Sequence, residues 1–299
     1  MNASPRTHGR NEDGIQGVAM DVALVTHAGL PDLAADERPV IPALARLGIH
    51  ARAAVWTDPN VAWGEFDVAI VRSTWDYHLR RGEFLEWVDR TAGSTRLWNP
   101  APVLRWNSHK SYLRDLEQRG VPIIPTVWSD GSRTLEEVLS NRGWEDAVFK
   151  PVVSAAAHRT HRVRRTSLAA AEPLYRALCQ EQVVLVQPYL ESVERHGEHS
   201  LIFLDGVFSH AVDRPAVLAP TREFPGEEPI VATDSERALG VRALSAVGAP
   251  TLYARVDVAT DSSGSLCLME LELVEPTLFL ASAPAAVAKF AHAIRSHLT

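Results

Sequence analysis

The sequence of 299 residues is 46% hydrophobic, which is enough apolar material for about two or three packed units. Its formal net charge of −7 argues against a surface that binds nucleic acid or anionic lipid, and no apolar run approaches the roughly 20 residues of a membrane span. Cys179 and Cys267 both lie in apolar segments, so we expect reduced core cysteines of a cytoplasmic protein.

Residues 1–19 are polar and lack the apolar core of a signal peptide, so we expect a disordered tail. From residue 20 to about residue 100, short apolar segments alternate with helical ones. Strands are predicted at residues 21–26, 49–56 and 66–71, and helices at residues 35–47 and 81–90. This alternation is typical of a parallel sheet, which binds ligands at the carboxyl ends of its strands.

The third of these strands ends in a run of polar and aromatic residues, in the place expected for a substrate site. Its members are Arg72, Ser73, Thr74, Trp75, Asp76 and Tyr77. A loop that caps the following helix is an equally good interpretation of the same residues.

A central region is predicted over residues 101–190. A helix is expected to follow residues 107–110 and to run to Arg119, and further helices are expected at residues 134–139 and 169–180. Strands are expected at residues 147–151 and 183–190. Lys150 ends an apolar strand and leads into a loop of small residues, whose backbone amides can approach a phosphate closely. A basic cluster follows, for which a solvated hairpin is the alternative; it comprises His158, Arg159, His161, Arg162, Arg164 and Arg165.

The C-terminal region, residues 191–299, is predicted to be mainly antiparallel. A hairpin is expected at residues 200–212, around Asp205 and Gly206, because an Asp-Gly pair favours the tight turn of a two-residue loop. Further predictions are a charged loop at residues 191–198, a mobile surface loop at residues 219–230, and helices at residues 234–248 and 285–298.

A second predicted hairpin, residues 252–277, gathers acidic side chains. Side chains at i and i+2 share a face of a strand, so Arg255 and Asp257 line one face of the first strand and Glu270 and Glu272 one face of the second. The three carboxylates and the guanidinium would then form one patch. With the turn centred near Ser262, Arg255 would lie opposite Glu270. Two carboxylates about 4 Å apart repel by roughly 4 kcal/mol at a protein surface, and Mg²⁺ is the natural ion to neutralise them. The alternative is that these acids lie on a strand face that points to water. The apolar residues around the acids argue against this alternative.

These segments, taken in chain order, resemble the ATP-grasp ligases over residues 107–280. The resemblance is carried by Lys150, the small-residue loop, residues 186–190, Gly197-Glu198 before the Asp205-Gly206 turn, and the Arg255, Asp257, Glu270 and Glu272 set. It is closest to the glutathione synthetase and ribosomal-protein-glutamate ligase branch. It implies an α/β fold, α+β in its C-terminal part, in which an ATP-grasp unit follows an N-terminal parallel-sheet domain at residues 20–100.

The resemblance also implies roles for individual side chains toward ATP and Mg²⁺. The metal ligands would be Asp257, Glu270 and Glu272. The residues that contact ATP would be Lys110, Lys150, Ser154, Gln187, Leu190, Glu194 and Glu198. The transferred phosphoryl group would be stabilised by Lys150, Arg214 and Arg255.

Two positions depart from the family pattern. The phosphate loop, usually rich in glycine, reads Ala155-Ala156-Ala157 here, and alanine avoids the positive φ angles that glycine adopts freely. We therefore expect a stiffer loop. Glu272 stands where the family most often has asparagine, and its extra charge should favour a second metal ion or tighten the first.

Residues 72–78 and 105–110 further resemble the D-cycloserine-forming branch of these ligases. That resemblance implies cyclisation of O-ureido-D-serine through an acyl phosphate, with release of ADP, phosphate, CO₂ and ammonia. Arg255, together with Asp76 or Glu275, could bind such a small zwitterion, and Trp75 and Tyr77 could exclude water from the acyl phosphate.

Two other functions remain open from the sequence. An intermolecular ligase that joins two amino acids or extends a peptide would use the same residues. An ATP-binding module without turnover would explain the glycine-poor loop, although the three intact acids argue against it. The expected partner is a small amino acid, with no nucleic acid or membrane partner, and a homodimer is the open alternative to a monomer.

Overall fold

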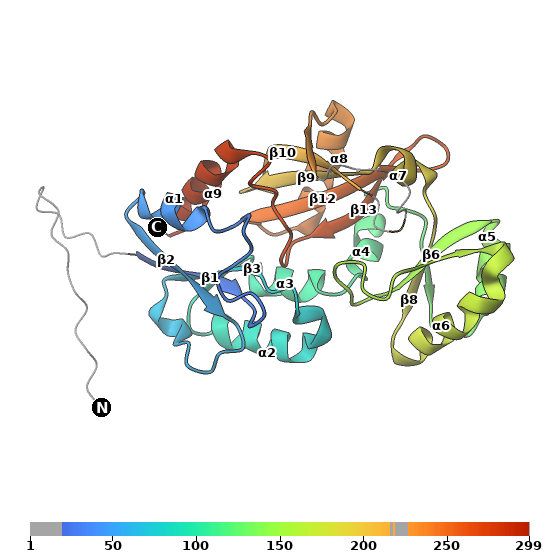
Figure 1. The fold of residues 1–299 in the computed structure, drawn as a ribbon, viewed down its shortest axis with the longest axis horizontal. Coiled ribbons are helices and arrows are strands. Elements are labelled where there is room, and N and C mark those ends of the chain that lie inside the picture. The colour runs from blue at the N-terminus through green and yellow to red at the C-terminus, as the bar shows by residue number, and fades with distance from the viewer. Residues whose placement is uncertain (1–19, 216–217, 219–226, 299) are drawn as a thin grey trace, which may run out of the picture.

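The computed structural model describes residues 20–298, apart from residues 216–217 and 219–226. The expected disordered tail, residues 1–19, lies outside the described residues. Within them the strands form three sheets, and the central sheet with helices α5 and α6 projects to one side of the other two (Figure 1). No helix of the described segments has both the length and the hydropathy needed to cross a membrane.

The N-terminal sheet is parallel, as the sequence predicted. Its strand order is β2-β1-β3-β4, and its strands are β1 (Met20–Thr26), β2 (Ile49–Val55), β3 (Val68–Ser73) and β4 (Arg96–Trp98). Val22 and Leu24 of β1 face a core shared with helices α1 (Val40–Ala45) and α9 (Pro284–Ser296), whereas Ala23 and Val25 face α2 (Arg81–Ala92). Because both faces are covered, all four side chains are buried.

The helix predicted at residues 35–47 is wrong in its first part. Residues 35–39 form turns, and α1 begins only at Val40, after Pro39. Two acids of this segment are committed to distant contacts: Asp36 accepts the backbone N–H groups of Leu280 and Ala281, and Glu37 pairs with Arg72. Tertiary contacts therefore override the local helical pattern here.

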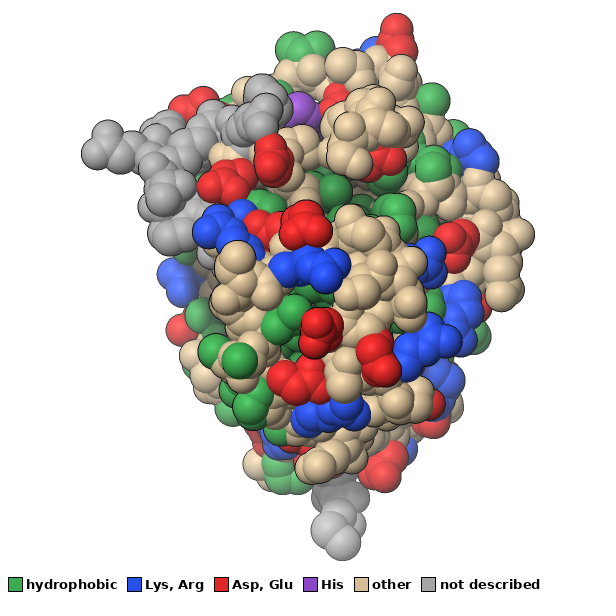
Figure 2. Space-filling view, turned by 90° about the vertical axis from the view of Figure 1, so that its right-hand side faces the viewer, with side chains coloured by type: hydrophobic (Ala, Val, Ile, Leu, Met, Phe, Trp, Pro, Cys, Tyr) green, Lys and Arg blue, Asp and Glu red, His purple; other side chains and the backbone are tan. Residues whose placement is uncertain are grey.

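The central sheet is antiparallel, with strand order β5-β8-β6-β7. Its strands are β5 (Val127–Ser129), β6 (Asp146–Pro151), β7 (His161–Arg164) and β8 (Val184–Pro188). Helices α5 (Leu135–Arg142) and α6 (Leu168–Glu181) contribute to its core, in which Phe149 packs against Tyr175. Figure 2 shows acidic and basic side chains interspersed over this end of the molecule, so no patch of a single charge sign covers it.

The helix expected after residues 107–110 is present, and a second helix that the sequence did not predict precedes it. Helix α3 (Ala101–Asn107) ends before α4 (Tyr112–Gln118) begins, and Lys110 lies in the break. The backbone N–H of Lys110 donates to the carbonyl of Val152, which ties this break to the loop that follows β6.

The C-terminal sheet has the strand order β11-β10-β9-β12-β13. Its strands are β9 (Glu198–Leu204), β10 (Val207–Arg214), β11 (Glu228–Ile230), β12 (Tyr253–Thr260) and β13 (Leu266–Glu272). Both predicted hairpins are present, and Asp205 and Gly206 adopt the positive φ values of 51° and 73° that a tight hairpin turn requires. The predicted helices 234–248 and 285–298 correspond to α8 (Asp234–Val247) and α9.

Two loop predictions in this region are wrong. Residues 191–196, expected as a loop, form the short helix α7 (Glu191–His196). In the segment predicted as a mobile loop, residues 228–230 are strand β11, which pairs with β10, while residues 219–226 lie outside the described residues. The described part of the chain also contains three short 3-10 helices, at Trp63–Glu65, Tyr77–Leu79 and Arg165–Ser167.

The predicted register of the acidic hairpin is also wrong. Arg255 pairs with Glu272, and Asp257 pairs with Glu270. An irregularity of the β-bulge type lies between Asp257 and Val258, and it shifts the register relative to a uniform hairpin. The two paired acids, Asp257 and Glu270, are consequently neighbours across the two strands.

An ion pair on the same sheet predicts how stability depends on pH. His199 Nδ1 lies 2.5 Å from Glu236 Oε1. The hydrogen bond with Glu236 raises the pKa of His199. Burial disfavours ionisation of Glu236, but hydrogen bonds from His199 and Thr233 outweigh it and hold the pKa of this carboxyl at about 2.

The pair should therefore stabilise the protein most between the unfolded pKa values of the two groups, 4.5 and 6.5. Its contribution is lost as the pH rises through the raised imidazole pKa, and as it falls from 4.5 through about 2. We expect His199→Asn to cost about 1 kcal/mol of unfolding free energy at pH 6 and clearly less at pH 9. Urea unfolding at the two pH values measures this, and an equal loss at both would contradict it.

Candidate active site

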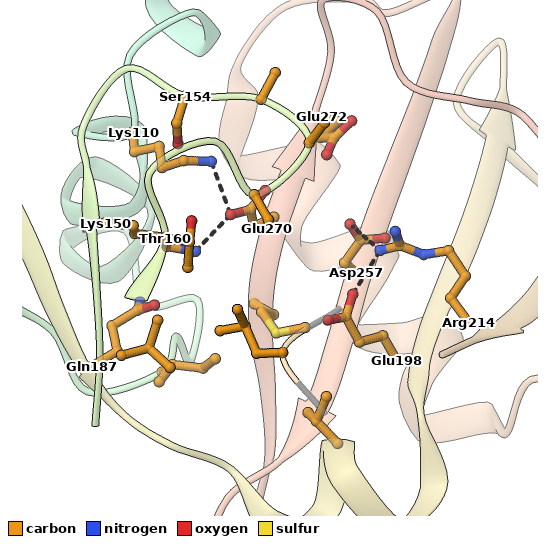
Figure 3. A pocket seen from close by; sticks show the side chains of 18 of the residues that line it. Lys110, Lys150, Ser154, Thr160, Gln187, Glu198, Arg214, Asp257, Glu270 and Glu272 are labelled. Atoms are coloured by element: carbon orange, nitrogen blue, oxygen red, sulfur yellow. Dashed lines mark hydrogen bonds and ion pairs between the residues drawn. The ribbon is translucent and has the colours of Figure 1, made fainter. Parts of the chain in front are cut away.

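One cavity of about 430 Å³ contains most of the predicted site residues. Its walls come from the α3–α4 break, the end of β6 with the following loop, the end of β8, and strands β9, β10, β12 and β13 (Figure 3). The central sheet and the C-terminal sheet thus face each other across it. Predicted ligands from segments more than a hundred residues apart meet in this one space.

Two lysines share one acid on one side of the cavity (Figure 3). Lys110 Nζ and Lys150 Nζ lie 2.8 Å and 2.6 Å from Glu270 Oε1. Burial disfavours the charged forms, but the two lysines outweigh it and lower the pKa of Glu270, while Glu270 raises that of Lys110. Lys150 lies near the end of a buried strand, where an unpaired ammonium group would be costly, and Glu270 is its ion-pair partner.

Two arginines hold the acids on the other side. Arg214 Nη2 lies 2.8 Å from Glu198 Oε2 and 3.0 Å from Asp257 Oδ2. Arg255 Nε lies 3.0 Å from Asp257 Oδ1, and its guanidinium also pairs with Glu272. Burial opposes ionisation of Asp257, but the two arginines prevail and lower its pKa. For Glu198 burial prevails and, with the charge of Asp257, raises the pKa to about 7.

Sequence reasoning missed Ser200, which links these groups. Its hydroxyl donates to Asp257 Oδ1 at 2.5 Å and accepts from Arg214 Nε at 2.7 Å. Ser200 is fully buried in β9 and pairs with Asp257 across to β12. A lone hydroxyl directly before the apolar run of residues 201–204 was the available signal.

The three predicted metal ligands, Asp257, Glu270 and Glu272, all line this cavity. Their carboxylate oxygens are the hard donors that Mg²⁺ prefers, so the donor set fits that ion. As described, each acid is instead held by a lysine or an arginine, and no group of three His, Cys, Asp or Glu side chains in residues 20–215, 218 and 227–298 is arranged as a metal site. A bound Mg²⁺ would share with these lysines and arginines the neutralisation of the three carboxylates.

The loop after β6 does not follow the expectation for alanine. Ala156, Ala157 and Arg159 adopt positive φ values of 48°, 55° and 56°. Non-glycine residues in this conformation cost of order 1 kcal/mol each, so contacts elsewhere must hold the loop. At one end Arg159 Nη2 lies 2.7 Å from Glu181 Oε1, and beside it the His158 ring lies 5.2 Å from that of His78.

The opposite end of the cavity is mostly apolar. Gln187 donates from Nε2 to Thr126 Oγ1 at 2.9 Å, and Leu190 lies near it. The remaining apolar walls there are Ile124, Val148, Pro188, Val193 and Met269. Glu194 does not line the cavity, which corrects its assignment as a nucleotide contact. It pairs instead with Arg162 at 3.2 Å, because α7 directs it away from the cavity.

The cluster at the end of β3 is divided by the structure. Trp75, with 39% of its surface exposed, and Glu275 line the main cavity, and Tyr77 lines an adjoining narrow pocket. The other predicted substrate residues lie outside both pockets: Arg72, Ser73, Thr74 and Asp76.

The physical reason for this correction is burial. Arg72, Ser73 and Thr74 are no more than 1% exposed, since β3 is covered on both faces. Asp76 is committed to Trp56 Nε1 and Arg80 Nη2, at 2.8 Å and 2.7 Å. Of the residues predicted for a substrate site at this strand end, Trp75 and Tyr77 therefore line a pocket, and their contact with a substrate stays a prediction.

Comparison with known proteins gives closely similar relatives. The family profile of the N-terminal domain of D-cycloserine synthetase DcsG matches residues 22–99. The cycloserine biosynthesis protein DcsG of Streptomyces lavendulae is 35% identical over 297 residues, which cover 93% of this chain and 98% of the relative. The crystal structure of D-cycloserine synthetase DcsG matches with a TM-score of 0.86 at 34% identity, over 93% of this chain and 100% of that chain.

More distant structures share the fold. The RimK domain protein ATP-grasp from Sphaerobacter thermophilus is 17% identical with a TM-score of 0.67, over 92% of this chain and 98% of that chain. The ATP-grasp ligase PsnB, complexed with precursor peptide and AMPPNP, is 17% identical with a TM-score of 0.65, over 98% of this chain and 100% of that chain. The ATP-grasp fold predicted from the sequence is thereby confirmed.

Proposed function

Because the chain belongs to the DcsG family of ATP-grasp ligases, we propose that it is an ADP-forming ligase that closes O-ureido-D-serine to D-cycloserine. The observation that supports this most is the single cavity in which two lysines, two arginines and the predicted metal ligands converge. Phosphoryl transfer needs little else from a protein, since it depends on positioning and on electrostatic stabilisation.

ATP would lie along the cavity, with its base at the apolar end. Gln187 and the backbone near Leu190 would contact the adenine, and Glu198 would accept hydrogen bonds from the ribose hydroxyls. Lys110 and Lys150 would contact the phosphates beneath the loop that begins at Ser154. Asp257, Glu270 and Glu272 would hold Mg²⁺, which when bound neutralises phosphate charge.

The reaction balances without a protein nucleophile. A carboxylate oxygen of the substrate attacks the γ-phosphorus, and ADP leaves; Lys150, Arg214 and Arg255 stabilise the phosphoryl group in transit. The ureido nitrogen attached to oxygen then attacks the acyl carbon, phosphate leaves, and that nitrogen loses its proton. Hydrolysis of the remaining carbamoyl group gives CO₂ and ammonia. Trp75 and Tyr77 would keep water from the acyl phosphate before the ring closes.

Glu275 is the best candidate for binding the substrate's ammonium group. It lines both pockets, and within the described residues it is the one cavity acid that forms no ion pair. Burial and the charge of Glu272 raise its pKa to about 8, as expected of a carboxyl group that lacks a cation. Asp76, the alternative from the sequence, is already occupied by Arg80.

The test is coupled ADP release with Mg²⁺, ATP and O-ureido-D-serine as the only amino acid, with the product identified by mass. The proposal expects ADP together with D-cycloserine. ADP release that requires two amino acids would instead identify an intermolecular ligase. ATP binding without turnover on either substrate set would identify a non-catalytic module.

Glu198 predicts a pH dependence of ATP binding. Its pKa of about 7 lies above the ordinary 4.5, so it is largely protonated at pH 6 and ionised at pH 8. Only the carboxylate can accept both ribose hydroxyls. We expect the KM for ATP to fall by roughly tenfold from pH 6 to pH 8, and Glu198→Gln to flatten this profile. A slope retained in the variant would contradict the assignment.

A further inference from the structure

The segment that follows β13 is held by side chains where strand pairing ends. Residues 273–276 are buried and lie beyond Glu272, the last residue of β13. Each of their four successive backbone carbonyls accepts a hydrogen bond from a side chain elsewhere in the chain. The pairs are Asn99 Nδ2 to Leu273 O at 2.8 Å, Tyr253 Oη to Val274 O at 2.9 Å, Trp75 Nε1 to Glu275 O at 3.3 Å and Arg72 Nη2 to Pro276 O at 2.7 Å.

We call these four donors the carbonyl ladder. Three of them follow or end strands of the N-terminal sheet: Arg72 and Trp75 at the end of β3, and Asn99 directly after β4. Asn99 is itself fixed, since its Oδ1 accepts the backbone N–H of Leu252 at 2.7 Å. The ladder therefore sets a segment of the C-terminal region against the carboxyl edge of the N-terminal sheet.

Arg72 is the costliest member of the ladder. It is 1% exposed, its Nε lies 3.0 Å from Glu37, and its guanidinium carbon lies 4.3 Å from the centre of the Tyr253 ring. A buried ion pair costs several kcal/mol of desolvation, and apolar residues of similar size often serve stability equally well. Stability alone therefore does not account for this buried pair, whereas its hydrogen bond to the Pro276 carbonyl gives it a positional role.

The group that the ladder positions is Glu275. Its backbone carbonyl is held by Trp75, and the next carbonyl, of Pro276, by Arg72. Its side chain lines the cavity together with Trp75 and Glu272. Since a displacement of about 1 Å in a binding group can cost a hundredfold in rate, a firmly held backbone at this point has a direct consequence for recognition.

We propose that Arg72, Asn99 and Tyr253 are positioning residues that hold the 273–276 backbone so that Glu275 recognises the ammonium group of the amino-acid substrate. This inference rests on the proposed function and deepens it. None of the three lines the cavity, so each would act on the substrate through the backbone alone.

The experiment compares binding of O-ureido-D-serine with binding of its analogue that lacks the amino group, in the full chain with Mg²⁺ and a non-hydrolysable ATP analogue. Tyr253→Phe removes one ladder donor and keeps the ring. The double variant Arg72→Met/Glu37→Gln removes another and leaves no unpaired buried charge. Tyr175→Phe is the matched control, because its hydroxyl also binds buried partners, Ser129 and the Arg133 carbonyl, in the central sheet.

We expect the wild type to prefer the amino compound, and each ladder variant to lose about tenfold of that preference, the value of roughly one hydrogen bond. Affinity for the ATP analogue should stay within about twofold in all variants, and Tyr175→Phe should keep the preference. If the ladder residues had a merely structural role, their loss would weaken the binding of O-ureido-D-serine and of the analogue without the amino group equally.

The possible outcomes distinguish a failure of the positioning role from a failure of the proposed function. A wild-type preference that survives in both ladder variants overturns the ladder inference and leaves the proposed function intact. A wild type without any preference overturns the role of Glu275 and the inference with it, and ADP release from O-ureido-D-serine then decides whether the ligase function stands.

Discussion

Glu270→Gln is expected to lower turnover by roughly a thousandfold, which corresponds to about 4 kcal/mol of lost transition-state stabilisation. Glu270 Oε1 accepts from both Lys110 and Lys150, and the same carboxylate is a predicted metal ligand. The substitution keeps the size of the side chain but removes the charge that pairs with the two ammonium groups and that would hold the metal ion beside them. Turnover by ADP release at saturating ATP and Mg²⁺ measures the effect.

Glu194→Gln is the matched control for this change. Both substitutions remove one carboxylate charge from an ion pair, but Glu194 pairs with Arg162 outside the cavity. We expect turnover within about twofold of the wild type, as for a partly exposed ion pair. Equal loss in the two variants would contradict both the catalytic assignment of Glu270 and the exclusion of Glu194.

Arg255→Met is expected to be the most destabilising single substitution in the cavity, by about 3 kcal/mol. Arg255 is 7% exposed and is the cation that pairs with both Asp257 and Glu272. Asp257 retains Arg214, but among the described residues no other cation pairs with Glu272. The stranded charge on Glu272 is the main cost, and turnover should fall with it.

The matched test is the double variant Arg255→Met/Glu272→Gln, which removes the stranded charge. Unfolding in urea at pH 7 should recover a clear part of the stability lost in the single variant, while turnover stays low because Arg255 is absent. A double variant less stable than Arg255→Met would show that Glu272 has another partner and would contradict this account.

The repeating patterns of the sequence predicted most strands and helices. The C-terminal hairpins illustrate the reason: period-two alternation and an Asp-Gly pair are local signals, and Asp205 and Gly206 adopt the expected turn. The helix at residues 35–47 and the loop at residues 191–198 were less well predicted, because distant contacts of Asp36 and Glu37 and the local packing of α7 decided them.

In the candidate site, too, some features follow from the local sequence and others depend on distant contacts. The residue types that meet in the cavity, from Lys110 to Glu272, could be chosen from strand ends and from their order in the chain. Arg72 could not be judged in this way, because a guanidinium at a strand end has the same sequence signal whether it faces a substrate or a buried Glu37. The register of Asp257 against Glu270 depended on a bulge that leaves no mark in the alternating pattern.

The sequence by itself determined the parallel N-terminal sheet, the two C-terminal hairpins, and the charged residue types that an ATP-grasp ligase requires, since these follow from local periodicity and from chemistry. The tertiary structure alone decided which charges share a partner, which acid of the cavity remains without one, and which strand-end residues face the core. Those outcomes depend on distances between segments far apart in the chain, such as Arg72 and Pro276, and electrostatic and packing energies are set by those distances.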